Sequence, residues 1–210
     1  MNIFGTQHLG LFIVGGLLLI ITPGQDTLYI VGRSVSQGRR AGVLSVLGIV
    51  TGCAIHALAA AFGLSAILAT SAYAFAIVKF AGAAYLCYLG VRMLLDRAEI
   101  AYAAKTFAPE SSWAIVRAGL LTNVLNPKVA LFFMAFLPQF VSPAADSRIT
   151  ALLFLGAIFI FNGTLWCLVI VWSASAMSRR LRTRQTSGLL LKRATGALFV
   201  GLGVRLAVSK

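Results

Sequence analysis

Apolar residues run through most of the chain in long stretches, and short polar clusters divide them into segments. Six such segments cover residues 8–32, 42–64, 73–94, 113–139, 149–173 and 188–208, and the boundary between the second and third lies near residues 70–73. Each reaches the roughly 20 residues that a helix needs to cross a bilayer core. Helix also satisfies every backbone polar group inside lipid without an open sheet edge. The pattern predicts an all-α polytopic membrane protein with six transmembrane helices.

Two of these segments are interrupted by polar residues around a proline. The first is broken at Thr22-Pro23, about 15 residues from its start, and the fourth at Asn126-Pro127, about 13 residues from its start. Proline has no N–H to donate, so the helix ends before it and a new one begins after it. At about 1.5 Å per residue, both breaks are expected near the midplane of the bilayer.

The two halves of the chain match in these features. A polar linker, 96–112, separates a first three-helix repeat, 1–95, from a second, 113–210, and an odd number of spans per repeat makes the two halves inverted. His56 and Asn162 also occupy corresponding places in the second and fifth segments. Interrupted apolar segments at matching positions indicate a transporter whose solute site lies between the repeats. Ser111 and Ser112, at the end of the linker, are expected N-caps of the fourth helix.

Charge adds an orientation to this picture. The chain has 60% hydrophobic and 11% charged residues, and its 18 Lys and Arg against 5 Asp and Glu give a net charge of +13. Most of the basic residues fall in the connections after the first, third and fifth segments, so these connections are expected in the cytoplasm and both termini outside. The excess charge is then a match for anionic lipid headgroups, and nucleic acid is not an expected partner. The N-terminus shows no signal peptide, so the first segment is expected to stay as a helix.

The breaks bring together one acid, Asp26, and one base, Lys128, beside two helix starts whose unpaired N–H groups can bind a carboxylate. An ionised side chain at mid-bilayer costs roughly 2.5–3.5 kcal/mol, so each needs a partner or a polar cavity. Two arrangements are open. Asp26 and Lys128 pair with each other, or both face a cavity in which Asp26 holds the ammonium and Lys128 the carboxylate of a zwitterionic solute.

The residues predicted to bind the solute are Thr22, Pro23, Gly24, Gln25, Asp26, Asn126, Pro127 and Lys128. Burial favours the neutral form of a carboxyl group, so Asp26 is also a candidate proton carrier. His56 is the second proton-coupling candidate, against the plainer interpretation of an interhelical hydrogen bond. Tyr29 and Asn162 are candidate cavity-lining residues, with packing between helices as the alternative. Gly48 and Gly52, four residues apart, predict close helix packing.

No cofactor or metal site is expected from the sequence. The three cysteines, Cys53, Cys87 and Cys167, are scattered in apolar runs without the spacing of a disulfide framework or a zinc site, and packing is their expected role.

Four stretches closely resemble the LysE/RhtB superfamily of bacterial amino-acid exporters, and especially its homoserine/threonine-type branch: TPGQDTLYIVGRSVSQGRRAG, KFAGAAYLCYLGVRML, LLTNVLNPKVALFFMAFLPQF and ATGALFVGLGVRL. They follow the order of the family and touch both halves of the chain. The resemblance implies six helices, residence in the bacterial inner membrane, outward transport of amino acids or derivatives, proton coupling and a homodimer. Gln25 departs from the family, which often has a second proline there. Because the expected cavity has one acid, neutral or hydroxylated amino acids such as homoserine or threonine are favoured over a dicationic substrate.

Three other functions are weighed against this one. A membrane thiol-disulfide carrier would need two reactive cysteines facing a common cavity, for which Cys53 and Cys87 lie on adjacent helices. A metal-ion exporter would need more ligands than Asp26 and His56. A membrane enzyme would need a nucleophile, a base and an orienting residue at motif spacing, which the sequence lacks, so no enzymatic activity is expected.

Overall fold

The computed structural model describes residues 4–66, 72–95, 107–142 and 144–180, with single positions between 193 and 208. Within these residues the secondary structure is helical, apart from one isolated bridge between Thr6 and Val141. The all-helical prediction is therefore confirmed for the described part of the chain. The predicted boundary at residues 70–71, most of the linker (96–106) and most of the sixth segment (188–208) lie outside the described residues.

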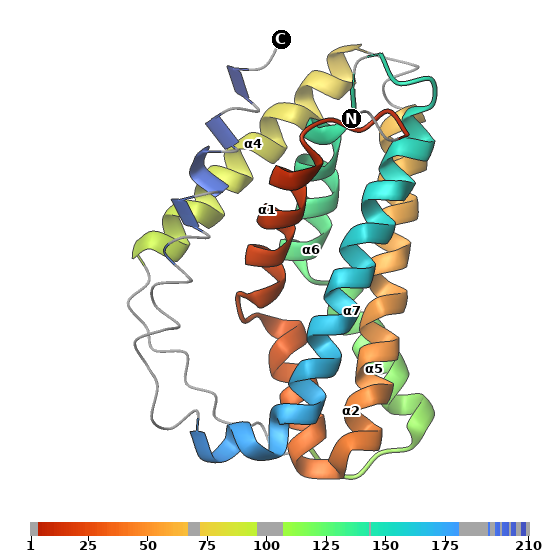
Figure 1. Ribbon diagram of the computed structural model, residues 1–210, viewed down its shortest axis with the longest axis vertical. Helices are drawn as coiled ribbons and strands as arrows, with labels where there is room; N and C mark the ends of the chain where they lie inside the picture. Colours follow the sequence, from red (N-terminus) through yellow and green to blue (C-terminus); the bar gives the residue numbers. More distant parts are fainter. Residues whose placement is uncertain are drawn as a thin grey trace.

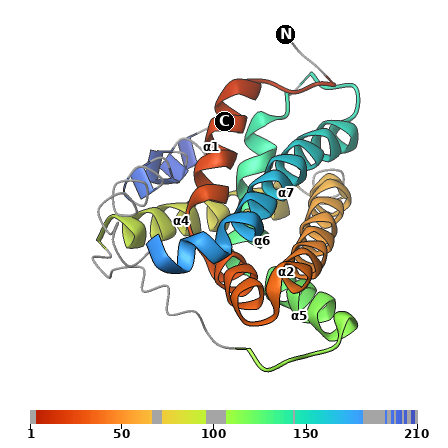
Figure 2. The same cartoon turned by 60° about the horizontal axis from the view of Figure 1, so that its bottom comes forward.

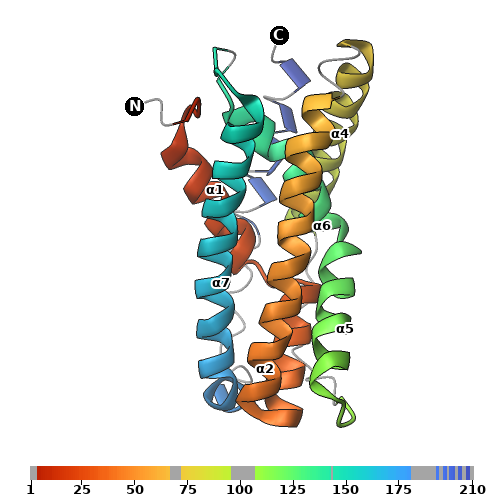
Figure 3. The same cartoon turned by 90° about the vertical axis from the view of Figure 1, so that its right-hand side faces the viewer.

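Two long helices and one shorter helix form the body of the molecule. In chain order, the elements are α1 (Leu9–Ile21), α2 (Gln25–Ala59), the π-helical turn η1 (Ala60–Leu64), α4 (Ala72–Leu95), α5 (Ser112–Val124), α6 (Pro127–Leu131), the π-helical turn η2 (Phe132–Phe136), the 3₁₀ turn η3 (Leu137–Phe140) and α7 (Arg148–Arg180). α2 packs against both α5 and α7, and the three run along the long axis of the molecule (Figures 1 and 3). α4 packs against α6 and η2 on the flank opposite α2 (Figure 2).

α2 consists of two helical arms that meet at Gly38. This residue has φ 82° and ψ −179°, a backbone conformation that is accessible mainly to glycine. A Cβ built on Gly42 would overlap Ser34 Oγ, so the two arms lie against each other directly after the turn. The expected connection between the first two segments, at residues 33–41, is therefore almost entirely helical, because a single glycine supplies the reversal (Figure 1).

Two helical stretches within the described residues are long and apolar enough to cross a membrane, Gln25–Leu64 and Arg148–Ala174. The pair Ser112–Val124 and Pro127–Phe140, bent by 50°, adds a third if it forms one span. α1 is apolar but has 13 residues. At 1.5 Å per residue it is about 20 Å long, less than the ~30 Å of a hydrocarbon core. α7 extends past residue 173, its predicted end, because the following Ala, Met and Arg residues are good helix formers.

Glycine packing joins α2 to α5, which carries the second break. A Cβ on Gly48 would overlap the carbonyl oxygen of Val116, and a Cβ on Gly52 would lie 2.7 Å from Asn123 Oδ1. The close packing predicted for Gly48 and Gly52 is confirmed. The predicted cap of α5 is present too, since Ser111 Oγ accepts from the Ala114 N–H over 3.3 Å.

A cluster of phenylalanine rings packs between α1, η2, η3 and α7. The Phe132 ring lies 4.4 Å from Phe159 of α7 and 4.5 Å from Phe136, measured between centroids. Phe12 of α1 contacts the same group, with its centroid 5.3 Å from that of Phe140. These buried rings join α1, η2, η3 and α7, and so fix the N-terminal part of α1 relative to α7.

Arg33 lies inside α2 with 2% of its side chain exposed, although the charge pattern places it in a cytoplasmic connection. Its guanidinium pairs with Glu110 Oε2 at 2.8 Å and donates to Gln37 Oε1 at 3.0 Å and to the Ala108 carbonyl at 3.2 Å. The ring centroid of Phe107 lies 4.4 Å from Arg33 Cζ. The five donors of a guanidinium allow one buried arginine to fasten the segment before α5 onto α2.

We expect Glu110→Ala to lower the free energy of unfolding by about 1–2 kcal/mol. Removing one partner of a fully buried pair costs roughly 3–5 kcal/mol, and solvent reduces the effect here because Glu110 is 41% exposed. The measurement is thermal unfolding in detergent, with Asp146→Ala as a control at an exposed acid. Equal stability of the two variants would show that the Arg33–Glu110 pair contributes nothing.

Candidate functional site

The first break separates α1 from α2 at Thr22, Pro23 and Gly24. The Thr22 N–H still donates to the Leu18 carbonyl over 3.1 Å, and Thr22 Oγ1 donates to the same oxygen over 2.6 Å. Gly24 is extended, with φ −149° and ψ −165°, and being glycine it offers α2 no side-chain cap. The break therefore presents the last carbonyls of α1 and the first N–H groups of α2 to their surroundings.

The second break separates α5 from α6 at Leu125 and Asn126. Asn126 is the N-cap of α6, and its side-chain oxygen accepts from the Lys128 N–H over 3.1 Å. Pro127 occupies the first turn of α6, where its missing N–H costs nothing. Asn-Pro thus ends one helix and starts the next.

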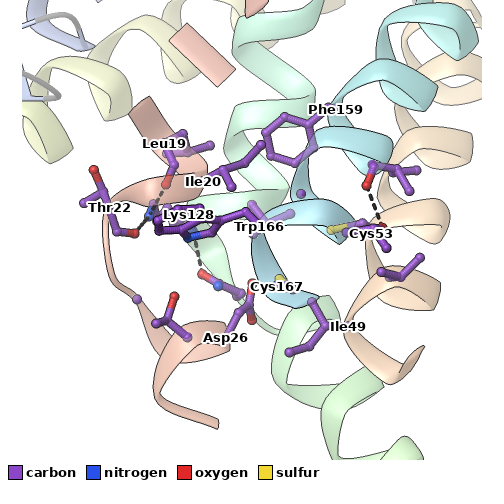
Figure 4. A pocket seen from close by; sticks show the side chains of 18 residues that line it. Leu19, Ile20, Thr22, Asp26, Ile49, Cys53, Lys128, Phe159, Trp166 and Cys167 are labelled. Carbon is purple, nitrogen blue, oxygen red and sulfur yellow. Dashed lines mark hydrogen bonds between the residues drawn. The ribbon is translucent and has the colours of Figure 1, made fainter. Parts of the chain in front are cut away.

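Lys128 joins the two breaks. Its Nζ donates to the carbonyl oxygens of Leu19, at 3.0 Å, and Thr22, at 2.9 Å, so a lysine of α6 caps the end of α1 (Figure 4). The position is favourable, because the C-terminal end of a helix carries a partial negative charge. A Cβ on Gly24 would lie 3.7 Å from Lys128 Nζ, which places both breaks in direct contact.

Asp26 is bound by the opposite half of the chain as well. Its Oδ2 accepts from Asn123 Nδ2 of α5 over 2.9 Å, and its Oδ1 is buried with no hydrogen-bond partner among the described residues. Asp26 and Lys128 both belong to the described part of the chain, and no nitrogen–oxygen distance of 4.0 Å or less joins them. Of the two arrangements open from the sequence, the structure does not contain the direct pair. Each charge has its own partners across the break.

A cavity of about 70 Å³, enough for several water molecules, lies between the two breaks and α7. Its polar side contains Thr22, Gly24, Asp26, Thr27, Asn126, Lys128 and Thr164. The remaining wall contains Leu19, Ile20, Ile49, Val50, Cys53, Val129, Phe159, Ile160, Gly163, Trp166 and Cys167. Figure 4 shows Lys128 and Asp26 approaching this space from opposite breaks, with Trp166 and Phe159 on the α7 side. One face of the cavity is charged and most of the rest is apolar.

The other predicted site residues lie around this cavity without lining it. Pro23 is half-buried within the first break, whereas Gln25 and Pro127 are exposed. Tyr29 is buried, and its hydroxyl donates to the Ile115 carbonyl over 2.7 Å. Asn162 is half-buried on α7 and is not among the lining residues.

His56 reaches the second break rather than the cavity. Its Nε2 lies 3.2 Å from the carbonyl oxygen of Asn123, and its ring stacks on Phe133 with 6.1 Å between centroids. A carbonyl oxygen only accepts, so Nε2 carries the hydrogen in this contact. The histidine thus makes an interhelical hydrogen bond to the residue that holds Asp26.

Asn123 and Trp166 are absent from the sequence-based prediction, and each has a buried polar side-chain atom at or beside the cavity. A signal for Asn123 is present, since it is a polar residue in an apolar helix, three positions before Asn126 and therefore on nearly the same helix face. Trp166 lines the cavity with a buried Nε1 that has no partner among the described residues. In the sequence, Trp166 lies in a continuous apolar run, so the pattern does not distinguish a cavity-lining tryptophan from one that packs between helices.

The cysteines are free thiols with different surroundings. Cys53 of α2 and Cys167 of α7 both line the cavity, whereas Cys87 of α4 lies elsewhere, with its sulfur 3.9 Å from the Val200 carbonyl oxygen. The pair considered from sequence, Cys53 and Cys87, does not share this cavity.

Comparisons with known proteins give a consistent result over nearly the whole chain. A family model described as LysE type translocator matches residues 17–210. A leucine efflux protein of Enterobacter sp. (strain 638) is 29% identical over 204 residues, covering 97% of either chain. A leucine efflux protein of Salmonella typhimurium is 27% identical over 204 residues, covering 97% of this chain and 96% of the relative. An uncharacterized membrane protein of Pseudomonas aeruginosa is 30% identical over 213 residues, covering 100% of this chain and 99% of the relative. No solved structure matches the chain.

Proposed function

Because the chain belongs to the LysE type translocator family, we propose that it exports neutral amino acids from the cytoplasm and that the cavity between the two helix breaks is its solute site. One observation carries the proposal: both breaks line a single cavity, which offers a small molecule an acid, a base and an apolar wall at once. Carboxylate, ammonium and an aliphatic side chain are the three parts of a neutral amino acid.

The charged groups suggest the orientation of the solute. Asp26 Oδ1 has no hydrogen-bond partner within the described residues, so it is available to the α-ammonium group. An ammonium has three N–H donors, and Lys128 uses two of them on Leu19 and Thr22. The third donor and the uncapped N-terminus of α2 are then the binding partners of the carboxylate.

The rest of the cavity favours an aliphatic substrate. Leu19, Ile49, Val129 and Phe159 contribute apolar wall, and burial of an aliphatic side chain against it stabilises the complex by roughly 1.5–3 kcal/mol. Two relatives are named leucine efflux proteins. We therefore place leucine-like amino acids ahead of homoserine and threonine, whose hydroxyl would find Thr27 or Thr164 on the polar side.

The architecture we propose has six transmembrane helices in two inverted repeats, residues 1–95 and 113–210, joined by the cytoplasmic linker 96–112. The reciprocal contacts support it, since Asp26 of the first half is bound by Asn123 of the second and Lys128 of the second half binds carbonyls of the first. The protein would be a homodimer in the bacterial inner membrane, with both termini on the periplasmic side. Lipid headgroups would then match the basic cytoplasmic connections.

The test of the function is an efflux assay with the purified protein in proteoliposomes loaded with labelled amino acids. We expect export of leucine, slower export of threonine and homoserine, and none of lysine, whose second cation has no partner on the apolar wall. Export that rises with an inward proton gradient would support proton coupling. Failure to move any neutral amino acid would contradict the proposed function.

A thiol-disulfide carrier is kept as the alternative because Cys53 and Cys167 line the same cavity. We expect the variant with Cys53, Cys87 and Cys167 all replaced by serine to export leucine at a rate near that of the wild type, because an amino-acid site needs no thiol. The measurement is the same efflux assay. Complete loss of export in this variant, with normal amounts of folded protein, would contradict this expectation and show that transport requires a cysteine thiol.

A further inference from the structure

Asn123 is the residue that holds the Asp26 carboxylate. Its side chain is fully buried, with 0% exposed, and its Nδ2 donates to Asp26 Oδ2 over 2.9 Å. The second oxygen of the carboxylate, Oδ1, has no partner among the described residues. A carboxylate with one oxygen fixed and the other unoccupied has a defined direction in which it can accept a further hydrogen bond.

Asn123 is itself fixed by three contacts. Its backbone carbonyl oxygen accepts from the Asn126 N–H over 2.9 Å and is also contacted by His56 Nε2 at 3.2 Å. On the α2 side, Gly52 leaves room for the amide, since a Cβ there would lie 2.7 Å from Asn123 Oδ1 and 2.8 Å from its Cβ. These contacts fix the backbone of Asn123 and leave its amide beside Asp26, where Nδ2 donates to the carboxylate and Oδ1 has no partner among the described residues.

We propose that Asn123 is a positioning residue for substrate recognition: it orients Asp26 so that Oδ1 receives the α-ammonium group of the amino acid. This inference rests on the proposed function, because it requires that Asp26 contacts the solute. The simpler alternative is that Asn123 only fastens α5 to α2. The two roles differ in one measurable way, because positioning affects only solutes that carry an ammonium group.

The test compares leucine with 4-methylpentanoate, the analogue that lacks the amino group, using the full-length protein in proteoliposomes. Transport of labelled leucine gives KM and Vmax, and its inhibition by 4-methylpentanoate gives the affinity for the analogue. We expect Asn123→Ala to raise the KM for leucine roughly 10- to 100-fold, the size expected for one hydrogen bond to a charged group. Vmax and the inhibition constant of 4-methylpentanoate should stay near their wild-type values.

Gly52→Ala provides a second variant that leaves Asn123 in place and pushes its amide away from Asp26. We expect the same selective weakening of leucine. Gly63→Ala, in η1 directly after α2, is the matched control, because a Cβ at Gly63 has no neighbour within 4 Å. It should behave like the wild type toward both compounds.

A KM for leucine that is unchanged in both Asn123→Ala and Gly52→Ala would overturn the positioning role. So would an equal loss of affinity for leucine and 4-methylpentanoate, which is the result of a purely structural role. In either case impaired export by Asp26→Asn would leave the proposed function standing. A wild type that moves no leucine would overturn the positioning role together with the function on which it rests.

Discussion

Replacing Lys128 by methionine is expected to reduce export roughly 100-fold and to destabilise the protein. The substitution removes two charge-assisted hydrogen bonds, to the carbonyl oxygens of Leu19 and Thr22, worth roughly 3–6 kcal/mol together. It also removes a cation whose placement inside the membrane costs roughly 2.5–3.5 kcal/mol. At the middle of these ranges the hydrogen bonds outweigh the cost, so the net loss of unfolding free energy should be about 1–2 kcal/mol.

Lys128→Arg is the matched control for this prediction. A guanidinium keeps the positive charge and supplies donors for the two carbonyls, so most of the stability should return. Its larger, planar head would occupy cavity space near Gly24, so export should stay low. The measurements are thermal unfolding in detergent and leucine efflux. A Lys128→Met protein as stable and as active as the wild type would show that the contact between the breaks is incidental.

Asp26→Asn is expected to reduce export to a similar extent while leaving the protein as stable as the wild type or more stable. The asparagine oxygen still accepts from Asn123, and the charge that costs roughly 2.5–3.5 kcal/mol inside the membrane is gone. The lost interaction is the one with the solute ammonium, which the proposed site makes only during transport. Stability and activity would therefore change in opposite directions, as is typical of a functional charge.

Asp26→Asn also tests the proton-carrier role. An asparagine cannot take up a proton, so exchange of leucine across the membrane without a gradient should persist at a low rate while accumulation driven by a proton gradient disappears. Export against a gradient with unchanged dependence on protons would contradict the assignment of Asp26, and would leave His56 as the other coupling candidate.

Both helix breaks could be predicted from the sequence, because a proline within an apolar run interrupts a helix whatever the helix packs against. The reversal at Gly38 could not, because the charged residues around it suggest a loop, whereas one glycine with positive φ turns the chain within helix. The burial of Arg33 could not be predicted from the sequence either. Its charge indicates an exposed connection, and only the fold shows the carboxylate of Glu110 that allows its burial.

Within the site, the sequence indicates which residue types are unusual but not which of their neighbours they meet. Asp26 and Lys128 are conspicuous as charges in apolar segments, and the sequence allows a direct ion pair between them. The structure instead gives each of them partners from the opposite break, because Lys128 lies at the end of α1 and Asn123 occupies the place beside Asp26. Helix rotation, which decides such contacts, is set by the packing of α2 on α5 through Gly48 and Gly52.

The most direct measurement uses the native cysteines as reporters of the cavity. Single-cysteine proteins that retain Cys53, Cys167 or Cys87 are labelled with a small thiol reagent, with and without excess leucine or threonine. If an amino acid occupies the cavity between the breaks, it should slow the labelling of Cys53 and Cys167 and leave that of Cys87 unchanged. If neither amino acid changes the labelling rate of Cys53 and Cys167, in a protein that exports one of them, the solute binds elsewhere and the proposed site is wrong.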